Sequence, residues 1–310
     1  VPQGSVLGPK LFLLYINDLP NATPNTEIRI FADDANQFVR HKNLQDLKTN
    51  SELAIKQIIL WMTANKLTIN YEKTNFAIFS PFVTDTDEKK FNTINIDGQQ
   101  VKRVSSVKYL GIYFDDKLSW KDHILHVSTK IKSLSGIFFK YRQFIPRTCL
   151  KNLYFALVYP IIQYGIEIYG NTKITYLEDL KILNNRILRL LQFADLRTKI
   201  HELYVVYHTL PVHLLHDFGL CTIIYKFLNV KLLLPESFHN YFRLNSSIHL
   251  HSTRSMSNLH IERSNKSLGQ RALNYHAAKA WNNLPNLIKS LPSLPILKKT
   301  LYGHFVENYF

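Results

Sequence analysis

Two adjacent carboxylates, Asp33 and Asp34, follow the apolar run Ile28–Ala32 in the segment IRIFADDANQF. Glu27–Ala32 and Asn36–Arg40 are predicted strands, which places both acids at the tip of a hairpin. Like charges so close repel each other unless cations lie beside them. Mg²⁺ takes oxygen ligands, and two such ions can activate a hydroxyl nucleophile and stabilise a departing pyrophosphate. The pattern indicates phosphoryl transfer, although aspartates are also common in turns because they bond local amides.

The charge balance points to a polyanionic partner. The 310 residues include 38 Lys and Arg against 23 Asp and Glu, a formal net charge of +15. An excess of this size favours nucleic acid, although an inert basic surface gives the same count. Hydrophobic residues make up 46% and charged residues 20%, which is typical of a folded protein and excludes a disordered one.

The cysteines and the apolar stretches exclude other classes of protein. Cys149 and Cys221 lie far apart without a CxxC motif, so neither a disulfide framework nor a zinc-ligand pattern is present, and a reducing compartment is expected. The longest apolar runs, LFLLYI and ALVYPII, are far shorter than the roughly 20 residues of a membrane span. No membrane partner is expected.

The first part of the chain mixes helices and strands. Pro9 opens a short apolar helix, and Asn43 is a plausible N-cap of a long one that Asn65 closes. Asp97-Gly98 is a tight-turn signal between two short strands. The strands predicted after the long helix are Leu67–Asn70, Asn75–Ser80, Thr93–Ile96, Val101–Val104 and Val107–Phe114.

Helical periodicity dominates the rest of the chain. Apolar residues recur at alternating steps of four and three from Trp120 to Tyr141, which is one stripe of a long helix. Further helices are predicted over Arg147–Val158, Tyr176–Phe193, His213–Asn229 and Tyr275–Asn283.

Several short motifs together resemble the palm of a reverse transcriptase. These are VPQGSVLGP, FADD, the NYEKT of Asn70–Thr74 and the KYLGIYFD of Lys108–Asp115, in the family's order and spacing. The phenylalanine before ADD and the serine of QGS resemble non-LTR (LINE-type) retrotransposons of the jockey-like branch. Four later landmarks resemble that branch too: KLSWKDHI of Lys117–Ile124, YPIIQYG of Tyr159–Gly165, TRS of Thr253–Ser255 and AKAWNNLP of Ala278–Pro285.

The resemblance implies roles for the acids and the first loop. Asp33 and Asp34 would be metal-binding, catalytic carboxylates. Gln3, Gly4 and Ser5 would touch the incoming nucleotide and the template. From the residues alone, a glycine lets backbone approach a ligand closely, and an ordinary helix cap explains the loop equally well.

The resemblance also implies roles for two later motifs. Lys73 would lie near the leaving pyrophosphate as a catalytic residue, and its plain alternative is a solvated lysine at a strand end. Tyr109, Leu110 and Gly111 would form the turn that grips the primer end. Packing within the sheet is the alternative for these three residues, Leu110 in particular.

The implied fold is α+β. Residues 1–118 would form a partial reverse-transcriptase palm, an antiparallel sheet with helices, followed by a helical thumb over 119–200 and a helical C-terminal extension over 201–310. The family carries a further metal-binding aspartate and the fingers upstream of the QGS loop. Val1 is therefore interpreted as a truncation point inside a polymerase domain, and the chain alone is expected to be inactive.

The implied function is RNA-directed DNA synthesis, a nucleotidyl transfer to a primer 3′-hydroxyl. Mg²⁺ or Mn²⁺ would be the cofactor of the parent enzyme, and RNA template, DNA primer and deoxynucleoside triphosphates would be the partners. The alternatives are a non-catalytic nucleic-acid-binding module, which would use basic stretches such as Lys130–Lys140, and a decayed fragment without a role. An unrelated two-carboxylate hydrolase is disfavoured, since it would make the other motifs coincidences.

Overall fold

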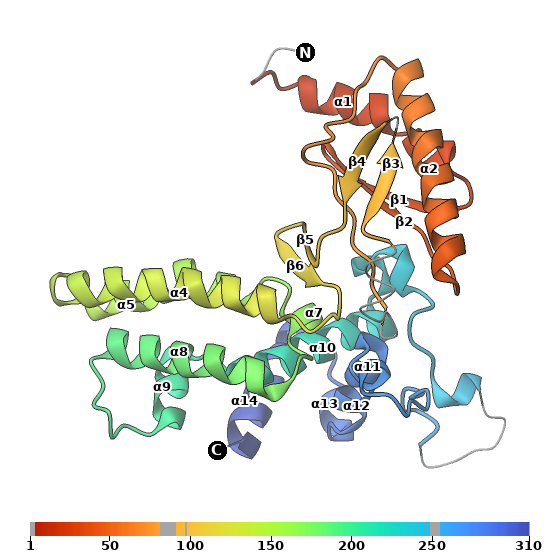
Figure 1. The fold of residues 1–310 in the computed structure, drawn as a ribbon. Coiled ribbons are helices and arrows are strands. Elements are labelled where there is room, and N and C mark those ends of the chain that lie inside the picture. Colours follow the sequence, from red (N-terminus) through yellow and green to blue (C-terminus); the bar gives the residue numbers. More distant parts are fainter. Residues whose placement is uncertain (1–3, 81–90, 97, 249–254, 310) are drawn as a thin grey trace. The chain divides into compact units, whose positions relative to one another are not determined.

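The computed structural model describes residues 4–80, 91–96, 98–248 and 255–309. The chain forms two compact units (Figure 1). The N-terminal unit comprises Val1–Tyr109 and Phe114–Leu118, and the helical unit comprises Leu110–Tyr113 and Ser119–Phe310. Over the described ranges, no helix combines the length and the apolar character that crossing a membrane requires. Gln3 and Asp97, both singled out by sequence, lie outside the described residues.

The N-terminal unit mixes helices with small antiparallel sheets, so the α+β class is confirmed. The strands pair as separate two-stranded sheets, β1 with β2, β3 with β4 and β5 with β6. The elements are α1 (Gly8–Ile16), β1 (Glu27–Phe31), β2 (Asp34–Phe38), α2 (Leu44–Ala64), β3 (Thr93–Ile96), β4 (Gln99–Lys102), β5 (Ser106–Tyr109) and β6 (Ile112–Asp115).

Helix α2 organises this unit because it packs against two small cores. The first core holds the buried side chains of β3 and β4, among them Ile94 and Val101. The second holds Ile16, Leu19 and Ile28 and packs against Trp61 of α2. The predicted caps of α2 are confirmed: the Asn43 side chain accepts a hydrogen bond from the amide of Gln45, and Asn65 ends the helix.

Two predicted strands of this unit are wrong. Leu67–Asn70 and Asn75–Ser80 contain no strand, and only Phe76 forms a single parallel bridge, to Arg103. Val107–Phe114 was expected as one strand, but it folds as the β5–β6 hairpin. Alternation of apolar residues marks extended chain, and it does not show whether a neighbouring strand is close enough to pair.

The helical unit confirms the predicted change of pattern. Its helices are α4 (Lys121–Tyr141), α5 (Arg147–Leu153), α6 (Tyr159–Gln163), α7 (Ile166–Tyr169), α8 (Ile174–Gln192), α9 (Ile200–Tyr207), α10 (Val212–Asn229), α11 (Ser267–Gln270), α12 (Leu273–Asn282), α13 (Asn286–Lys289) and α14 (Leu294–Tyr309). A π-helical turn, Tyr154–Val158, joins α5 to α6. Figure 1 shows α4 and α8 running side by side, and they are the helix pair with the closest association.

Buried side chains of α10, α12 and α14 form one hydrophobic core of the helical unit. Trp281 of α12 is 2% exposed, and Leu297 of α14 is fully buried. The side chain of Asn282 exchanges two hydrogen bonds with the backbone of Leu259, accepting at 2.9 Å and donating at 2.8 Å. The WNNLP landmark therefore anchors the irregular stretch between α10 and α12.

Candidate active site and nucleic-acid surface

The adjacent aspartates lie at a tight hairpin, as predicted. Phe31 pairs with Asp34, which leaves Ala32 and Asp33 as a two-residue turn. Ala32 adopts a positive φ of 50°, as two-residue hairpin turns require. Both aspartates are exposed. Strand β2 begins at Asp34, two residues earlier than expected, because the turn needs no more than two residues.

The base of this hairpin is held by apolar burial and by ion pairs. Ile28 of β1 is 8% exposed and lies in the core cluster beside α2. The carboxylate of Glu27 pairs with Arg29 at 2.6 Å and with Arg40 at 3.2 Å. These arginines therefore pair with Glu27 at the base of the hairpin, whereas Asp33 and Asp34 lie at its tip.

The first loop is described from Gly4 onward. Gly4 has a φ of +87°, a conformation that favours glycine, and open space lies where a Cβ would be. The hydroxyl of Ser5 accepts a hydrogen bond from the amide of Gly8 at 2.8 Å, at the start of α1. Ser5 therefore serves the helix start in this structure, and the nucleotide and template contacts implied for Gln3, Gly4 and Ser5 stay predictions.

Lys73 lies in a turn and is exposed. The carbonyl of Asn70 accepts hydrogen bonds from the amides of Lys73 and Thr74 and from the Thr74 hydroxyl, and the Asn70 side chain also accepts from Lys73. This arrangement is typical of asparagine in turns. Lys73 is thus an exposed cation on a hydrogen-bonded turn, and its role at a pyrophosphate stays a prediction.

The KYLG motif forms the β5–β6 hairpin, with Leu110 and Gly111 as its turn. Their φ angles are +46° and +84°, the pattern of a type I′ turn. Leu110 is 37% exposed, and the primer-grip role implied for Tyr109, Leu110 and Gly111 stays a prediction, with packing as its alternative. A glycine is required at the second turn position more than at the first, since its φ is the larger of the two.

Tyr109, at the end of β5, connects the two motif hairpins within the N-terminal unit. Its ring lies edge-on to Phe38 of β2, with centroids 6.5 Å apart, and 6.3 Å from the ring of Phe114. Phe38 lies at the other end of the strand that begins at Asp34. Tyr109 therefore contacts the same hairpin that carries the two aspartates.

The YPIIQYG landmark packs against the KYLG turn inside the helical unit. The Tyr164 hydroxyl donates a hydrogen bond to the carbonyl of Leu110 at 2.6 Å. Gly165 has a φ of +72°, and a Cβ there would lie 2.4 Å from Cδ1 of Ile112. The sequence alone predicts no role for YPIIQYG. The glycine after tyrosine was the available signal, since a turn at that position needs a positive φ.

Cations and aromatic rings gather where α4 ends. The Arg142 guanidinium lies 4.9 Å from the ring centroid of Phe193 and 5.7 Å from that of Phe139, and it donates to the carbonyl of Leu190. The guanidinium of Arg147 also lies over Phe193, 5.5 Å from the ring centroid. The lysines predicted to line this helix, Lys121, Lys130, Lys132 and Lys140, are all exposed.

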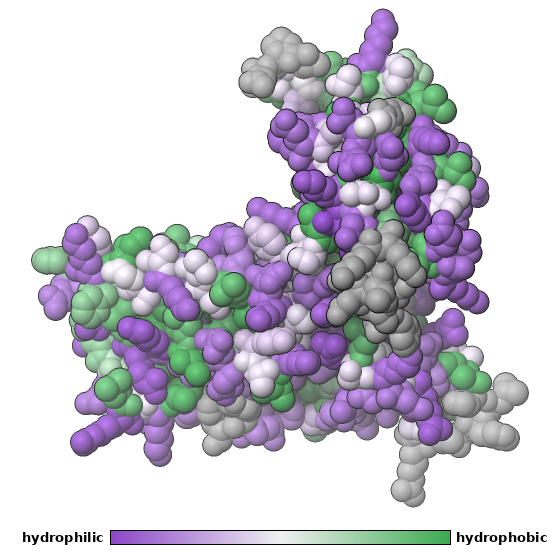
Figure 2. Space-filling view, viewed as in Figure 1, coloured by the Kyte–Doolittle hydropathy of each residue, from purple (hydrophilic) through white to green (hydrophobic). Residues whose placement is uncertain are grey.

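A shallow pocket of about 410 Å³ lies between α4 and α8 near these cations. Its lining combines two cations, Lys132 and Arg186, with the apolar side chains of Phe139 and Leu183. Figure 2 shows hydrophilic and hydrophobic side chains interleaved over this part of the helical unit. Such interleaving suits a ligand with charged groups and flat apolar faces, which describes a nucleic acid.

His123 lies in the first turn of α4 and is 2% exposed. Its Nδ1 accepts a hydrogen bond from the amide of Tyr113, and its ring lies edge-on to Tyr169. Burial, with the nearby charges of His126 and Lys130, lowers the pKa of His123 to about 4. The imidazole is therefore neutral at pH 7 and belongs to the core.

Residues 1–114 match the reverse transcriptase (RNA-dependent DNA polymerase) family. The chain is 28% identical over 200 residues to the RNA-directed DNA polymerase from mobile element jockey of Drosophila melanogaster, which covers 61% of this chain and 21% of that protein. A probable RNA-directed DNA polymerase from transposon X-element of the same species is 24% identical, over 62% of this chain and 21% of the relative.

The probable polymerase from transposon BS is 26% identical, over 61% of this chain and 22% of that protein. The chain thus spans about a fifth of the length of the curated relatives that it matches. No solved structure is significantly similar to it. The resemblance to jockey-like elements is confirmed by these relatives, and residues 1–114 match the model of the reverse transcriptase family.

Proposed function

We propose that the chain is a segment of an RNA-directed DNA polymerase of a mobile element. The N-terminal unit contributes to the palm, and the helical unit begins with a thumb over 119–200 and continues as an extension over 201–310. The observation that carries this proposal is the pair of exposed carboxylates, Asp33 and Asp34, on a two-residue hairpin turn inside the family match.

The chemistry of the hairpin tip suits divalent metal ions. Two carboxylates supply the hard oxygen ligands that Mg²⁺ or Mn²⁺ prefers, and Glu27 at the hairpin base keeps its own cationic partners. When bound, such ions activate a primer 3′-hydroxyl and stabilise the departing pyrophosphate. Asp33 and Asp34 would hold the metal, and Lys73 would neutralise charge on the leaving group.

The substrates of this activity are an RNA template, a DNA primer and deoxynucleoside triphosphates. Gln3, Gly4 and Ser5 act at the nucleotide and template, and Tyr109, Leu110 and Gly111 at the primer end. The ring contact between Tyr109 and Phe38 supports this assignment, because it connects the primer-grip hairpin to the strand that starts at Asp34.

Metal-directed backbone cleavage tests the metal site without requiring polymerisation. Fe²⁺ replaces Mg²⁺ at hard oxygen sites, and with ascorbate it generates radicals that cut the nearby backbone. We expect cleavage near Asp33 that excess Mg²⁺ suppresses and that Asp33→Asn with Asp34→Asn abolishes. Asp122→Asn is the matched control, because Asp122 is an exposed acid in the first turn of α4. Unchanged cleavage in the double variant would refute the assignment.

A second function, nucleic-acid binding without catalysis, is favoured by the stacking of Arg142 on Phe139 and Phe193. An arginine that lies over aromatic rings can offer its remaining N–H groups to phosphate oxygens, although one terminal nitrogen of Arg142 already donates to Leu190. This function requires only the helical unit. A chain that binds an RNA–DNA hybrid but shows no cleavage at Asp33 would favour it over the polymerase assignment.

A further inference from the structure

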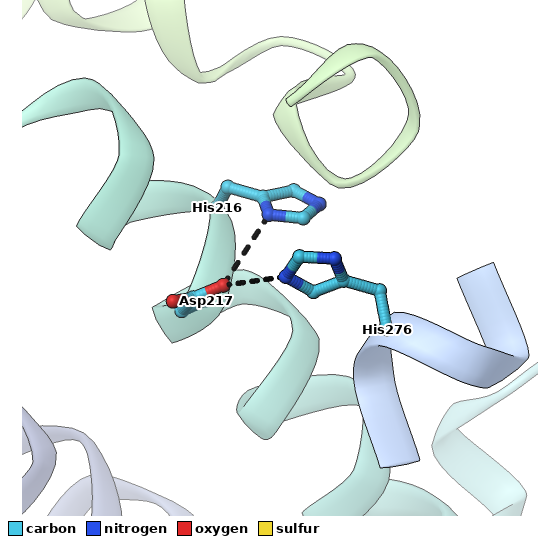
Figure 3. A group of neighbouring side chains, drawn as sticks. All are labelled: His216, Asp217 and His276. Carbon is cyan, nitrogen blue, oxygen red and sulfur yellow. Dashed lines mark hydrogen bonds and ion pairs between the residues drawn. The ribbon is translucent and has the colours of Figure 1, made fainter. Parts of the chain in front are cut away.

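We propose that His216, Asp217 and His276 form a binding site for a divalent transition-metal ion, with Zn²⁺ as the expected metal. His216 and Asp217 lie on α10, and His276 lies on α12. Figure 3 shows the two imidazoles converging on the carboxylate from different helices. The site lies in the helical unit and uses none of the residues assigned to polymerisation.

The distances fit a tetrahedral metal. Oδ1 of Asp217 lies 3.4 Å from Nδ1 of His216 and 3.2 Å from Nε2 of His276. One ligand atom from each residue falls within 4.8 Å of the other two. Ligands at about 2.0–2.2 Å from a tetrahedral Zn²⁺ are separated by about 3.3–3.6 Å, so both nitrogen–oxygen distances already lie close to the values that such a site requires.

The three side chains are held in place by the fold. His216 is 2% exposed, and a Cβ on Gly170 would lie 2.5 Å from its Cδ2, so the end of α7 closes one side of the imidazole. The two imidazole rings lie 4.9 Å apart. Both helices contribute to the same hydrophobic core, where Trp281 of α12 is buried. A site fixed in this way loses little conformational entropy when it takes a metal.

The charge state of the site suits a cation at neutral pH. The imidazole nitrogens of His216 and His276 face the carboxylate of Asp217 and favour its ionised form. The carboxylate is therefore ionised. Each neutral imidazole can turn a lone pair toward the metal while its other nitrogen carries the proton.

One buried nitrogen of the cluster has no hydrogen-bond partner. Nε2 of His216 is buried without a hydrogen-bond partner, although Nδ1 faces Asp217. With a metal on Nδ1, this Nε2 would carry the imidazole proton, so the unsatisfied atom is not itself a ligand of the ion.

The donor set selects the kind of metal. Two imidazole nitrogens and one carboxylate suit Zn²⁺ and its neighbours, whereas Mg²⁺ requires oxygen ligands in octahedral geometry. Three protein ligands leave a fourth position for water or for an outside group. The bound ion would join α10 to α12, and it would differ from the Mg²⁺ or Mn²⁺ proposed at Asp33.

Titration of the 310-residue chain with Zn²⁺ and Co²⁺ tests the site. The Cys149→Ser background removes the exposed thiol, which would bind zinc adventitiously. We expect one tightly bound Zn²⁺ per chain, a rise in the melting temperature, and the visible absorption bands of tetrahedral Co²⁺. Mg²⁺ at the same concentrations should produce none of these changes.

His276→Gln should weaken zinc binding by more than about a hundredfold, since losing even an outer-shell partner costs about 10–100-fold. His276 is the least buried ligand, with 38% of its side chain exposed, and circular dichroism would verify that the variant folds. His208→Asn is the control, because His208 is exposed at a positive φ of 52° that asparagine tolerates. Binding unchanged in His276→Gln, or no zinc binding by the folded parent chain, would overturn the proposal.

Discussion

The hydroxyl of Tyr164 donates a 2.6 Å hydrogen bond to the carbonyl of Leu110, the first residue of the KYLG turn. Two motifs separated by more than 50 positions therefore meet in one local contact. Gly165 follows Tyr164 at a positive φ and lies against Ile112. Gly165 therefore sets the backbone geometry of this contact, and Tyr164 makes its hydrogen bond. The turn proposed to grip the primer is thus held by a side chain of the helical unit.

Tyr164→Phe should lower the free energy of unfolding of the helical unit by about 0.5–1 kcal/mol, because it removes one partly exposed hydrogen bond. Gly165→Ala should lower it by about 1–2 kcal/mol, since alanine is strained at a φ of +72°. Urea unfolding followed by the fluorescence of Trp120 and Trp281, in a Trp61→Phe background, measures both changes.

Gly136→Ala is the matched control for Gly165→Ala. Gly136 lies in the interior of α4, and nothing lies within 4 Å of the position where a Cβ would be. Alanine there should stabilise the unit by about 0.5–1 kcal/mol, because it restricts the unfolded chain and favours the helix. Equal effects of the two substitutions would contradict the strain assigned to Gly165.

The stability of the helical unit should decrease as the pH falls from about 6.5 to about 4. The pKa of His123 is lowered to about 4 in the folded chain, first by burial, whereas an unfolded histidine titrates near 6.5. Within this window the unfolded state binds the extra proton, so one group changes the free energy of unfolding by at most about 1.4 kcal/mol per pH unit.

His123→Gln isolates this contribution from that of the other titrating groups. Glutamine keeps an acceptor for the amide of Tyr113 but does not titrate. The difference in unfolding free energy between parent and variant should shrink as the pH falls from 6.5 to 4, in urea melts at matched ionic strength. A difference independent of pH would show that His123 does not carry the effect.

The sequence predicted the hairpin at Asp33 and Asp34 and the long helix α4 because both follow local rules. A two-residue turn needs polar or small residues between strands, and an apolar stripe at helical spacing needs only a buried partner. In α4 the stripe residues Ile124, Val127, Ile131 and Phe138 are indeed buried. These features depend little on the rest of the chain.

The remaining features depend on contacts between residues that lie far apart in the chain, and no local pattern of a single sequence reveals such contacts. Asn282 clamps the backbone of Leu259, and Tyr164 reaches Leu110, yet neither pair shares a local pattern. Helices α9 and α14 were missed for a related reason. The short α9 offers little local periodicity, and Pro295 in the first turn of α14 was an unused signal of a helix start; burial of Leu203 and Leu297 stabilises the two helices.

A purified chain should bind an RNA–DNA hybrid through its backbone, with little sequence preference and strong salt dependence. Each phosphate neutralised contributes roughly −0.7 to −0.9 to the slope of log K against log salt, so about four to six contacts make a fourfold rise in salt cost on the order of a hundredfold in affinity. Fluorescence anisotropy with a labelled hybrid at several salt concentrations measures the slope.

Lys130→Gln with Lys132→Gln should reduce the magnitude of that slope by roughly one to two, because both lysines lie exposed on α4. Lys299→Gln is the matched control, since Lys299 is an exposed lysine on α14 and lies far along the chain from α4. Salt-independent binding, or the same slope in all variants, would remove the nucleic-acid surface proposed for α4.

A polypeptide of residues 1–310 should show no primer extension on an RNA template, even with Mn²⁺. The two-metal mechanism needs ligands that hold both ions in line with the attacking and leaving oxygens, and the carboxylates proposed here come from a single hairpin. Misplacing a reacting group by about 1 Å already costs about a hundredfold. A radiolabelled primer–template assay, with hybrid binding measured in parallel, would separate failure of catalysis from failure to bind. Template-dependent incorporation that Asp33→Ala abolishes, and that Asp122→Asn leaves intact, would show that Asp33 and Asp34 suffice with the remaining residues of this chain.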